Sequence, residues 1–150
     1  MNMIFRPATM EDARQLFDWR NDPQTRVNSI NIKKVEWESH VTWLESSLVS
    51  SSRRIFIAMI EGEAVGTIRL DDDSSKGKTE LSWTIAPDQR GKGYGQAMVQ
   101  AAIDLPLVKE KKILARIKPE NTPSIKIVEK LGFVKLAIEP PEPTEWLIQR

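Results

Sequence analysis

The sequence of 150 residues contains no cysteine and a single histidine, His40. Without cysteine the chain cannot form a disulfide, a thiolate metal site or a cysteine nucleophile. One histidine is too few for the histidine clusters that commonly bind transition metals. These absences exclude most metal chemistry and all thiol chemistry, so we expect no metal.

The chain also lacks a charge excess and a long hydrophobic run. Its 22 Lys and Arg residues against 21 Asp and Glu residues give a net charge of +1, which creates no field that would attract nucleic acid or an acidic membrane. No apolar stretch approaches the ~20 residues of a membrane span, and the first nine residues lack the apolar core of a signal peptide. We therefore expect one domain, residues 1–150, that is cytoplasmic and has no nucleic-acid or membrane partner.

The spacing of apolar residues predicts an α+β chain. Thr9 and Asp12 form a capping box that begins a helix, and this helix ends at Asp22 because the following Pro23 disfavours helical backbone there. Residues 20–29 are predicted as a loop. Strands are predicted at Ile4–Arg6, Arg54–Ile60, Ala64–Leu70, Thr79–Ile85, Lys112–Ile117, Phe133–Ile138 and Glu145–Ile148, and further helices at Lys33–Leu48, Gln96–Asp104 and Pro123–Leu131.

A basic, glycine-rich loop lies between a predicted strand and a predicted helix. Residues 90–95 place Arg90 and Lys92 beside backbone N–H groups that Gly93 and Gly95 leave unshielded at a helix N-terminus. Such a surface is suited to a pyrophosphate. The same glycines also suit a plain turn between strand and helix, and the loop alone favours neither interpretation.

With two motifs downstream, this loop resembles that of the GNAT superfamily of acetyl-coenzyme A dependent N-acetyltransferases. The resemblance rests on Arg90-x-x-Gly93-x-Gly95 after Ile85-Ala-Pro, on Asn121-Thr-Pro-Ser124 and on Glu129-Lys-Leu-Gly132-Phe133. The order of elements extends it to nearly the whole chain. It implies the GNAT fold, a mixed twisted sheet of six to seven strands with about four helices, in which the central parallel strands splay apart.

The resemblance implies acetyl-CoA as the co-substrate. In the family the glycine loop binds the cofactor pyrophosphate, and the preceding strand offers backbone groups to the two amides of the extended pantetheine arm. The residues to which it assigns cofactor binding are Thr84, Ile85, Arg90, Gly91, Lys92, Gly93, Tyr94, Gly95, Gln96, Asn121 and Ser124.

Attack of an amine on the thioester requires a group that takes up a proton. Glu80 shares a strand face with Ser82 and Thr84 by the two-residue period. Many GNAT enzymes have a glutamate here, so Glu80 is our candidate general base; the alternative is an ordinary strand carboxylate. Val128 replaces the tyrosine that is the family's usual general acid. Ser124 is a weaker candidate for that role, and a thiol with a pKa near ~8.5 needs less help to leave.

The acceptor side resembles the branch of the family that acetylates amino sugars carried by nucleotides. The residues that carry this hypothesis are Arg20, Asn21, Arg26, Ser29 and His40. The two arginines could meet a diphosphate, and aromatic rings could stack on a base or sugar. We interpret Trp37 and Trp43 as helix core, and His40 stays open between substrate binding and packing.

Two alternatives to this acceptor hypothesis follow from the same residues. Related branches of the family acetylate the N-terminal amines of proteins, including ribosomal proteins. The missing tyrosine instead favours a catalytically idle module that only binds acyl-CoA. The expected partner is a small-molecule amine, with a protein N-terminal amine or acyl-CoA alone in the two alternatives. A homodimer is compatible with the resemblance.

Overall fold

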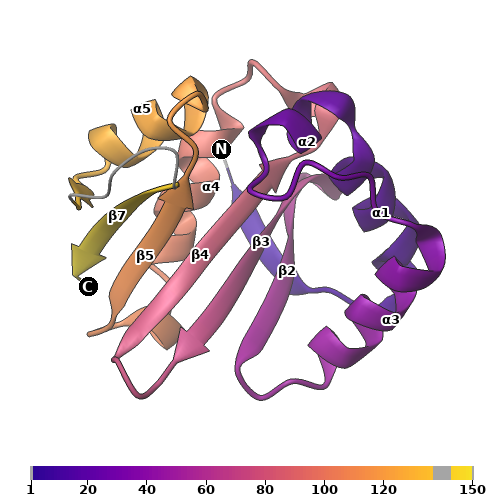
Figure 1. The fold of residues 1–150 in the computed structure, drawn as a ribbon, viewed down its shortest axis with the longest axis horizontal. Coiled ribbons are helices and arrows are strands. Elements are labelled where there is room, and N and C mark those ends of the chain that lie inside the picture. Colours follow the sequence, from indigo (N-terminus) through magenta and orange to yellow (C-terminus); the bar gives the residue numbers. More distant parts are fainter. Residues whose placement is uncertain (1, 137–142, 150) are drawn as a thin grey trace.

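Seven strands form one mixed sheet in the computed structural model, which describes residues 2–136 and 143–149. Across the sheet the order is β1-β2-β3-β4-β5-β7-β6; β4 and β5 run parallel, and the other neighbouring strands are antiparallel (Figure 1). The strands are β1 Met3–Pro7, β2 Arg53–Ile60, β3 Glu63–Asp73, β4 Lys78–Ile85, β5 Lys112–Ile117, β6 Val134–Lys135 and β7 Thr144–Gln149. This sheet confirms the fold class that the resemblance implies.

The parallel strands β4 and β5 are paired only where they begin. Their register joins residues 78–80 to residues 112–114, although β4 continues to Ile85 and β5 to Ile117. Residues 81–85 still pair with β3 on one edge, but in the described part of the chain they have no β5 partner on the other edge. Their backbone groups on that edge are therefore free for a ligand, and the predicted splay is confirmed.

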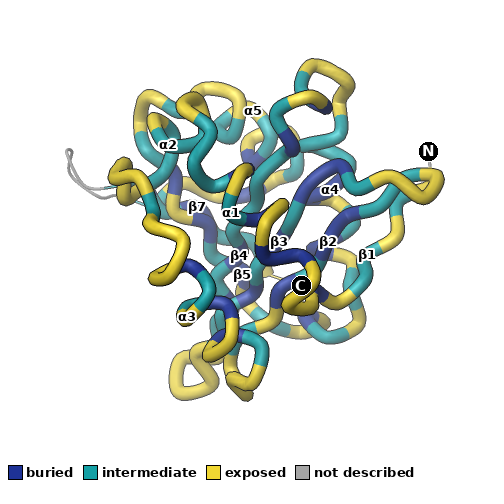
Figure 2. Tube along the Cα trace, turned by 90° about the vertical axis from the view of Figure 1, so that its right-hand side faces the viewer, coloured by how far each residue is buried: buried dark blue, intermediate teal, exposed yellow. Residues whose placement is uncertain are grey.

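Helices cover both faces of the sheet, and each face has its own hydrophobic core. On one face Leu81 packs with Met98 and Val128 from the helices that follow β4. On the other, Ile57 packs with Leu16 and Leu44 from the helices of the first third of the chain. The helices are α1 Ala13–Asn21, α2 Pro23–Asn28, α3 Trp37–Leu48, α4 Tyr94–Ile103 and α5 Thr122–Lys130. Figure 2 shows the buried residues concentrated in the strands and the inner sides of helices, with exposed residues in the loops.

The predicted capping box is present before α1. The Thr9 hydroxyl accepts a hydrogen bond from the backbone N–H of Glu11 at 3.2 Å, and Asp12 Oδ2 accepts from the Thr9 N–H at 2.8 Å. The box begins a short 3-10 turn, Met10–Asp12, that leads into α1. The sequence therefore predicts the start of this helical segment to within one turn.

The predicted loop at residues 20–29 is wrong, because α2 forms there. Asp22 leaves helical geometry, with ψ of 133°, and so ends α1. Its carboxylate then caps the next helix by accepting a hydrogen bond from the Thr25 N–H at 3.1 Å. Pro23 takes the first position of α2, where an N–H would have no intrahelical partner. The proline that stops one helix thus starts another.

Two further predictions need correction, and one reaches beyond the described residues. The second predicted helix begins at Trp37 and not at Lys33, and Trp37 is 40% exposed, so it is not helix core. The predicted strand Phe133–Ile138 shortens to β6, and its residues 137 and 138 lie outside the described part of the chain. Among the described residues, no helix is long and apolar enough to cross a membrane.

Candidate active site

The glycine loop leads into α4 with two residues in left-handed conformation. Gly91 and Gly93 have φ of +78° and +79°, and Gly93 is the N-cap of α4. A Cβ at either position would meet nothing within 4 Å, so the loop surface is open. The first N–H groups of a helix have no intrahelical partner. Loop and helix end thus present donors on an unobstructed surface.

Gly95 is a glycine for a different reason. It lies inside the first turn of α4, where a Cβ would stand 3.0 Å from Ile127 Cδ1 and 3.7 Å from Ile85 Cγ1. Its missing side chain lets α4 approach α5 and the end of β4. The predicted role of Gly95 in binding the cofactor stays a prediction, but its packing role is evident.

Arg90 is joined to α2. Its Nη2 donates to Asp22 Oδ2 at 2.6 Å and to the Thr25 hydroxyl at 3.0 Å. Burial raises the pKa of Asp22, but hydrogen bonds from Arg90 and Thr25 outweigh it, so the pKa of Asp22 is lowered overall. The other loop cation, Lys92, donates to Gln89 Oε1 at 3.0 Å. An anion at this loop would therefore meet Arg90 already paired with a carboxylate.

Asn121 and Ser124 lie together at the start of α5, beyond the end of β5. Asn121 is the N-cap, and its Oδ1 accepts from the Ser124 N–H at 3.3 Å. Val128, one turn further, is fully buried in the hydrophobic core. The side chain at the position of the family's usual general acid is therefore buried and cannot contact a ligand bound between β4 and β5.

Glu80 is ion-paired with β5. Arg116 Nε donates to Glu80 Oε2 at 3.1 Å, and the Glu80 side chain is 24% exposed. The next two residues on the same face, Ser82 and Thr84, line a cavity, whereas Leu81 points into the opposite core. Glu80 therefore stands one step along β4 from that cavity, at the point where β4 and β5 part.

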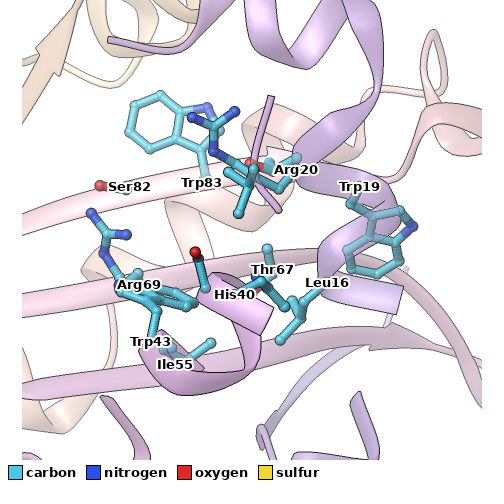
Figure 3. A pocket seen from close by; sticks show the side chains of 13 residues that line it. Leu16, Trp19, Arg20, His40, Trp43, Ile55, Thr67, Arg69, Ser82 and Trp83 are labelled. Carbon is cyan, nitrogen blue, oxygen red and sulfur yellow. The ribbon is translucent and has the colours of Figure 1, made fainter. Parts of the chain in front are cut away.

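The cavity lies between the α1–α3 helices and the face of β2, β3 and β4, and has a volume of about 370 Å³. Figure 3 shows Arg20 and Arg69 among the aromatic side chains of its wall. Among the described residues that line it, none is a carboxylate. The lining residues are Leu16, Trp19, Arg20, Val35, Ser39, His40, Trp43, Ile55, Thr67, Arg69, Ser82, Trp83 and Thr84.

The guanidinium of Arg20 is only partly satisfied. Its Nη2 donates to the Asn31 carbonyl at 2.6 Å, while its Nη1 is enclosed and has no hydrogen-bond partner among the described residues. The pKa of Arg20 is lowered, chiefly by burial and further by the nearby cations Arg26 and Arg69. Arg20 thus brings positive charge to the cavity with an unused donor.

Trp43 is held in the cavity wall by cations from two strands. The guanidinium carbons of Arg53 and Arg69 lie 5.7 and 5.8 Å from the Trp43 ring centroid. Both arginines donate to Asp71, at 2.6 and 2.9 Å. The interpretation of Trp43 as plain helix core is therefore incomplete, because its half-buried ring forms part of a ligand-accessible surface.

His40 is a neutral wall residue. It is 4% exposed, and its Nε2 lies 3.1 Å from the Ala13 carbonyl. Because a carbonyl oxygen only accepts, Nε2 carries the proton in this contact. Burial lowers the pKa of His40, although the hydrogen bond to Ala13 opposes that effect. His40 both packs and lines the cavity, so neither of its two predicted roles is excluded.

The other predicted acceptor residues lie outside the cavity lining and bind backbone. The Asn21 amide exchanges two hydrogen bonds with Val35, at 2.8 and 2.7 Å. Arg26 Nε donates to the Ile32 carbonyl at 3.3 Å, and the Ser29 hydroxyl to the Thr25 carbonyl at 2.6 Å. These contacts hold residues 29–36 in place, and Arg20 and His40 alone of the five predicted residues reach the cavity.

Thr67, Arg69 and Trp83 are among the cavity residues that the sequence-based predictions do not name. A signal for the first two exists in β3, where polar residues alternate with the buried Ile68 and Leu70. The two-residue period places Thr67 and Arg69 on the face that Ser82 and Thr84 share. Trp83 gives no such signal, because it also packs against the opposite core.

A family model described as an acetyltransferase (GNAT) domain matches residues 2–134. The chain belongs to the GNAT acetyltransferase family. Together with the splayed sheet, this makes the protein an N-acetyltransferase by family and fold. The matched region contains the glycine loop, Glu80, the cavity and Asn121.

Individual relatives resemble this GNAT protein at low sequence identity, in sequence or in structure. "Uncharacterized N-acetyltransferase p20" of Bacillus licheniformis is 28% identical over 141 residues, which cover 89% of this chain and 79% of that protein. The structure of aminoglycoside acetyltransferase AAC(6')-Ib with coenzyme A and kanamycin has a TM-score of 0.82 at 23% identity, covering 99% of this chain and 95% of that one. Spermidine/spermine N-acetyltransferase SpeG of Vibrio cholerae has a TM-score of 0.79 at 18% identity, covering 98% and 93%. None of these three names includes a nucleotide-linked sugar.

Proposed function

We propose that the protein transfers the acetyl group of acetyl-CoA directly to a primary amine bound in the cavity. The main support for this proposal is the part of the β4 edge that does not pair with β5. Residues 81–85 lead from the cavity wall to the glycine loop and, within the described residues, lack a β5 partner. An extended arm lying along this edge would place its phosphates at the loop and its thioester beside the cavity.

The cofactor contacts follow from this placement. The backbone groups of Thr84 and Ile85 at the free edge suit the two amides of pantetheine. The loop donors, with Lys92 and Arg90, suit the pyrophosphate. Asn121 and Ser124, across the splay at the start of α5, form the opposite wall. The coenzyme A bound in AAC(6')-Ib, a protein of the same fold, supports acetyl-CoA as the co-substrate.

In the proposed step the amine nitrogen attacks the thioester carbon, the C–S bond breaks and coenzyme A leaves as thiolate. The amine proton passes to Glu80. Successive residues on one face of a strand are about 6.6 Å apart, so Glu80, one such step from Ser82 and held by Arg116, reaches the amine through a water molecule. Ser124 remains the candidate donor of a proton to the thiolate, because buried Val128 offers none.

For the acceptor, an amino sugar carried by a nucleotide stays our first hypothesis. The Arg20 guanidinium and the tryptophans of the cavity support it, whereas Arg26 is engaged outside the cavity. A protein N-terminal amine is the second candidate, and the idle acyl-CoA module, favoured by Val128, the third. Kanamycin and spermidine, named with the similar structures, are polycations, and the carboxylate-free cavity wall offers them no counter-charge.

The test is release of coenzyme A thiol from acetyl-CoA over a panel of amines, for the parent and for Glu80→Gln. If Glu80 is the base, the variant keeps its shape but loses basicity, and turnover falls roughly 10²- to 10⁴-fold at neutral pH. The loss shrinks at high pH because more of the amine is already neutral. Glu145→Gln, which removes the same charge opposite Arg116 on β7, serves as the control and keeps its activity.

Two results would contradict this proposal. Near-normal turnover in Glu80→Gln would remove Glu80 from the mechanism. A parent protein that binds acetyl-CoA but releases no thiol with any amine would overturn the transfer itself and favour the idle module. We also expect the protein to act in the cytoplasm; fractionation of cells that produce it tests this.

A further inference from the structure

The charge of the cavity wall is the least expected feature of the site. Two guanidinium groups, Arg20 and Arg69, line it, and no carboxylate does so among the described residues. Arg69 is partly compensated by Asp71, which accepts from it at 2.9 Å outside the lining. In the described part of the chain, Arg20 forms no ion pair with a carboxylate, and its hydrogen bond goes to the Asn31 carbonyl. Because Asp71 also accepts from Arg53 at 2.6 Å, it balances only one of the two arginines that it binds, and the cavity keeps the full charge of Arg20 and part of that of Arg69.

Arg20 is fixed and incompletely bonded. Its Nη2 is held at 2.6 Å by the Asn31 carbonyl, and its enclosed Nη1 lacks a partner among the residues that the structure describes. A charged donor that is shielded from water and unpaired lowers stability. An anion in the cavity beside this guanidinium would balance its charge, so the cavity favours ligands that bring one.

Much of the rest of the wall is aromatic, beside the small polar side chains of Ser39, Thr67, Ser82 and Thr84. Trp19, Trp43 and Trp83 contribute three indole rings, and the aromatic His40 is neutral. Broad ring faces bind planar apolar groups over a large contact area. A cavity of about 370 Å³ is at the small end of the ~300–1,000 Å³ typical of ligand sites, so anion, ring and amine would lie close together.

We infer that the acceptor is an amine that also carries a carboxylate or phosphate group and a flat apolar group, with Arg20 as the residue that selects the anion. This inference rests on the proposed acetyl transfer and specifies its substrate class. The anion pairs with Arg20, the apolar group packs on the tryptophans, and the amine faces the Ser82–Thr84 segment of β4. Polycationic amines are disfavoured, since each extra ammonium would face Arg20 and Arg69 with no carboxylate in the described cavity lining.

The experiment measures kcat/KM for pairs of amines that differ in the anion. The carboxylate arm compares tryptophan with tryptamine and phenylalanine with phenethylamine. The phosphate arm compares a nucleotide-linked amino sugar with the free amino sugar. We expect the anionic member to be acetylated at least tenfold more efficiently in one arm, which identifies the source of the anion. Spermidine and kanamycin should be the poorest acceptors.

Arg20→Gln should remove this preference, mainly by raising KM for the anionic amine, while kcat/KM for the partner that lacks the anion changes little. Arg14→Gln is the matched control, because Arg14 is an exposed arginine of the same helix that lies over Trp37 and outside the cavity. Equal use of both members in every pair, or preferred use of spermidine or kanamycin, overturns the inference. So does an anion preference that survives in Arg20→Gln.

Failure of the transfer itself is distinguished by binding. Calorimetric titration of phenylalanine, phenethylamine and both forms of the amino sugar into the parent protein measures the same preference without turnover. Tighter binding of the anionic members, abolished by Arg20→Gln, supports the selecting role of Arg20 even if no amine is acetylated. Equal or absent binding in all pairs, together with absent turnover, overturns both proposals.

Discussion

At the scale of single residues, Asp12 shows how one carboxylate can join a side chain and the backbone through three hydrogen bonds from two residues. It accepts two hydrogen bonds from Arg6, at 2.7 and 2.9 Å, and one from the Thr9 N–H at 2.8 Å. The bond from Arg6 is the largest cause of the lowered pKa of Asp12, and the Thr9 N–H adds to it against the opposing effect of burial. The folded state therefore stabilises the ionised form of Asp12.

We predict that Asp12→Asn lowers the free energy of unfolding by about 1 kcal/mol at pH 7, a modest value because Arg6 is partly exposed and screened. The pKa of Asp12 is lower in the folded than in the unfolded state, so its contribution is present above about pH 4 and is lost as the pH falls through the folded value. Urea unfolding at pH 7, 4 and 3 should show parent and variant converging toward the lowest pH.

Asp18→Asn is the control for this prediction, because Asp18 is an exposed carboxylate on α1. It should change stability little at any of the three pH values. A difference between Asp12→Asn and the parent that is constant with pH would mean that shape, and not the charge of Asp12, is responsible.

At the scale of elements, α2 bridges the two halves of the splayed sheet. Arg90, from the loop after β4, binds Asp22 at the start of α2. From the other side, Lys118, just after β5, donates to the Val27 carbonyl at 2.6 Å. Figure 1 shows α2 near the end of β4 that leads to the glycine loop. Cations from both strands thus hold this short helix over the gap between them.

We predict that Asp22→Asn tightens coenzyme A binding about two- to fivefold, as expected from the ~0.4–1 kcal/mol of a partly exposed ion pair. Asparagine still caps α2, but it no longer neutralises Arg90, which is then free to meet the pyrophosphate. Calorimetric titration at low salt measures the change. Asp18→Asn removes the same charge from the neighbouring helix and should leave the affinity unchanged; weaker binding in Asp22→Asn would show that the pair positions Arg90 for the cofactor.

The elements also show where sequence patterns suffice. The glycine loop and its flanking strand and helix are contiguous, so local spacing predicts them. The sequence Asp22-Pro23 predicts two outcomes equally, because a proline can end one helix and can also occupy the first turn of a following helix. The cavity could not be predicted as a whole, because its lining residues come together only when α1 and α3 pack on β2, β3 and β4. Likewise, nothing local indicates that Arg26 would be bound to the Ile32 carbonyl.

At the scale of the whole molecule, the sheet joins two cores that a ligand would link. One core lies under α4 and α5, and the other under α1 and α3. The proposed cofactor site runs between them along the free edge of β4, and touches the glycine loop on one side and the start of α5 on the other. Because such a ligand contacts elements from both halves, binding should stabilise the fold as a unit.

We therefore predict that acetyl-CoA at a hundredfold excess over its Kd stabilises the parent by about 2.7 kcal/mol, or roughly 5–10 °C in Tm for a chain of this size. Gly93→Val should abolish this shift, because its side chain would fill the open surface proposed for the pyrophosphate. Gly77→Val is the matched control: Gly77 has φ of +61°, Gly93 has φ of +79°, and a Cβ at either meets nothing within 4 Å. Both variants should lower the Tm of the free protein through backbone strain, but only Gly93→Val should lose the response to acetyl-CoA. A full ligand-induced shift in Gly93→Val, measured by scanning calorimetry, would place the pyrophosphate elsewhere.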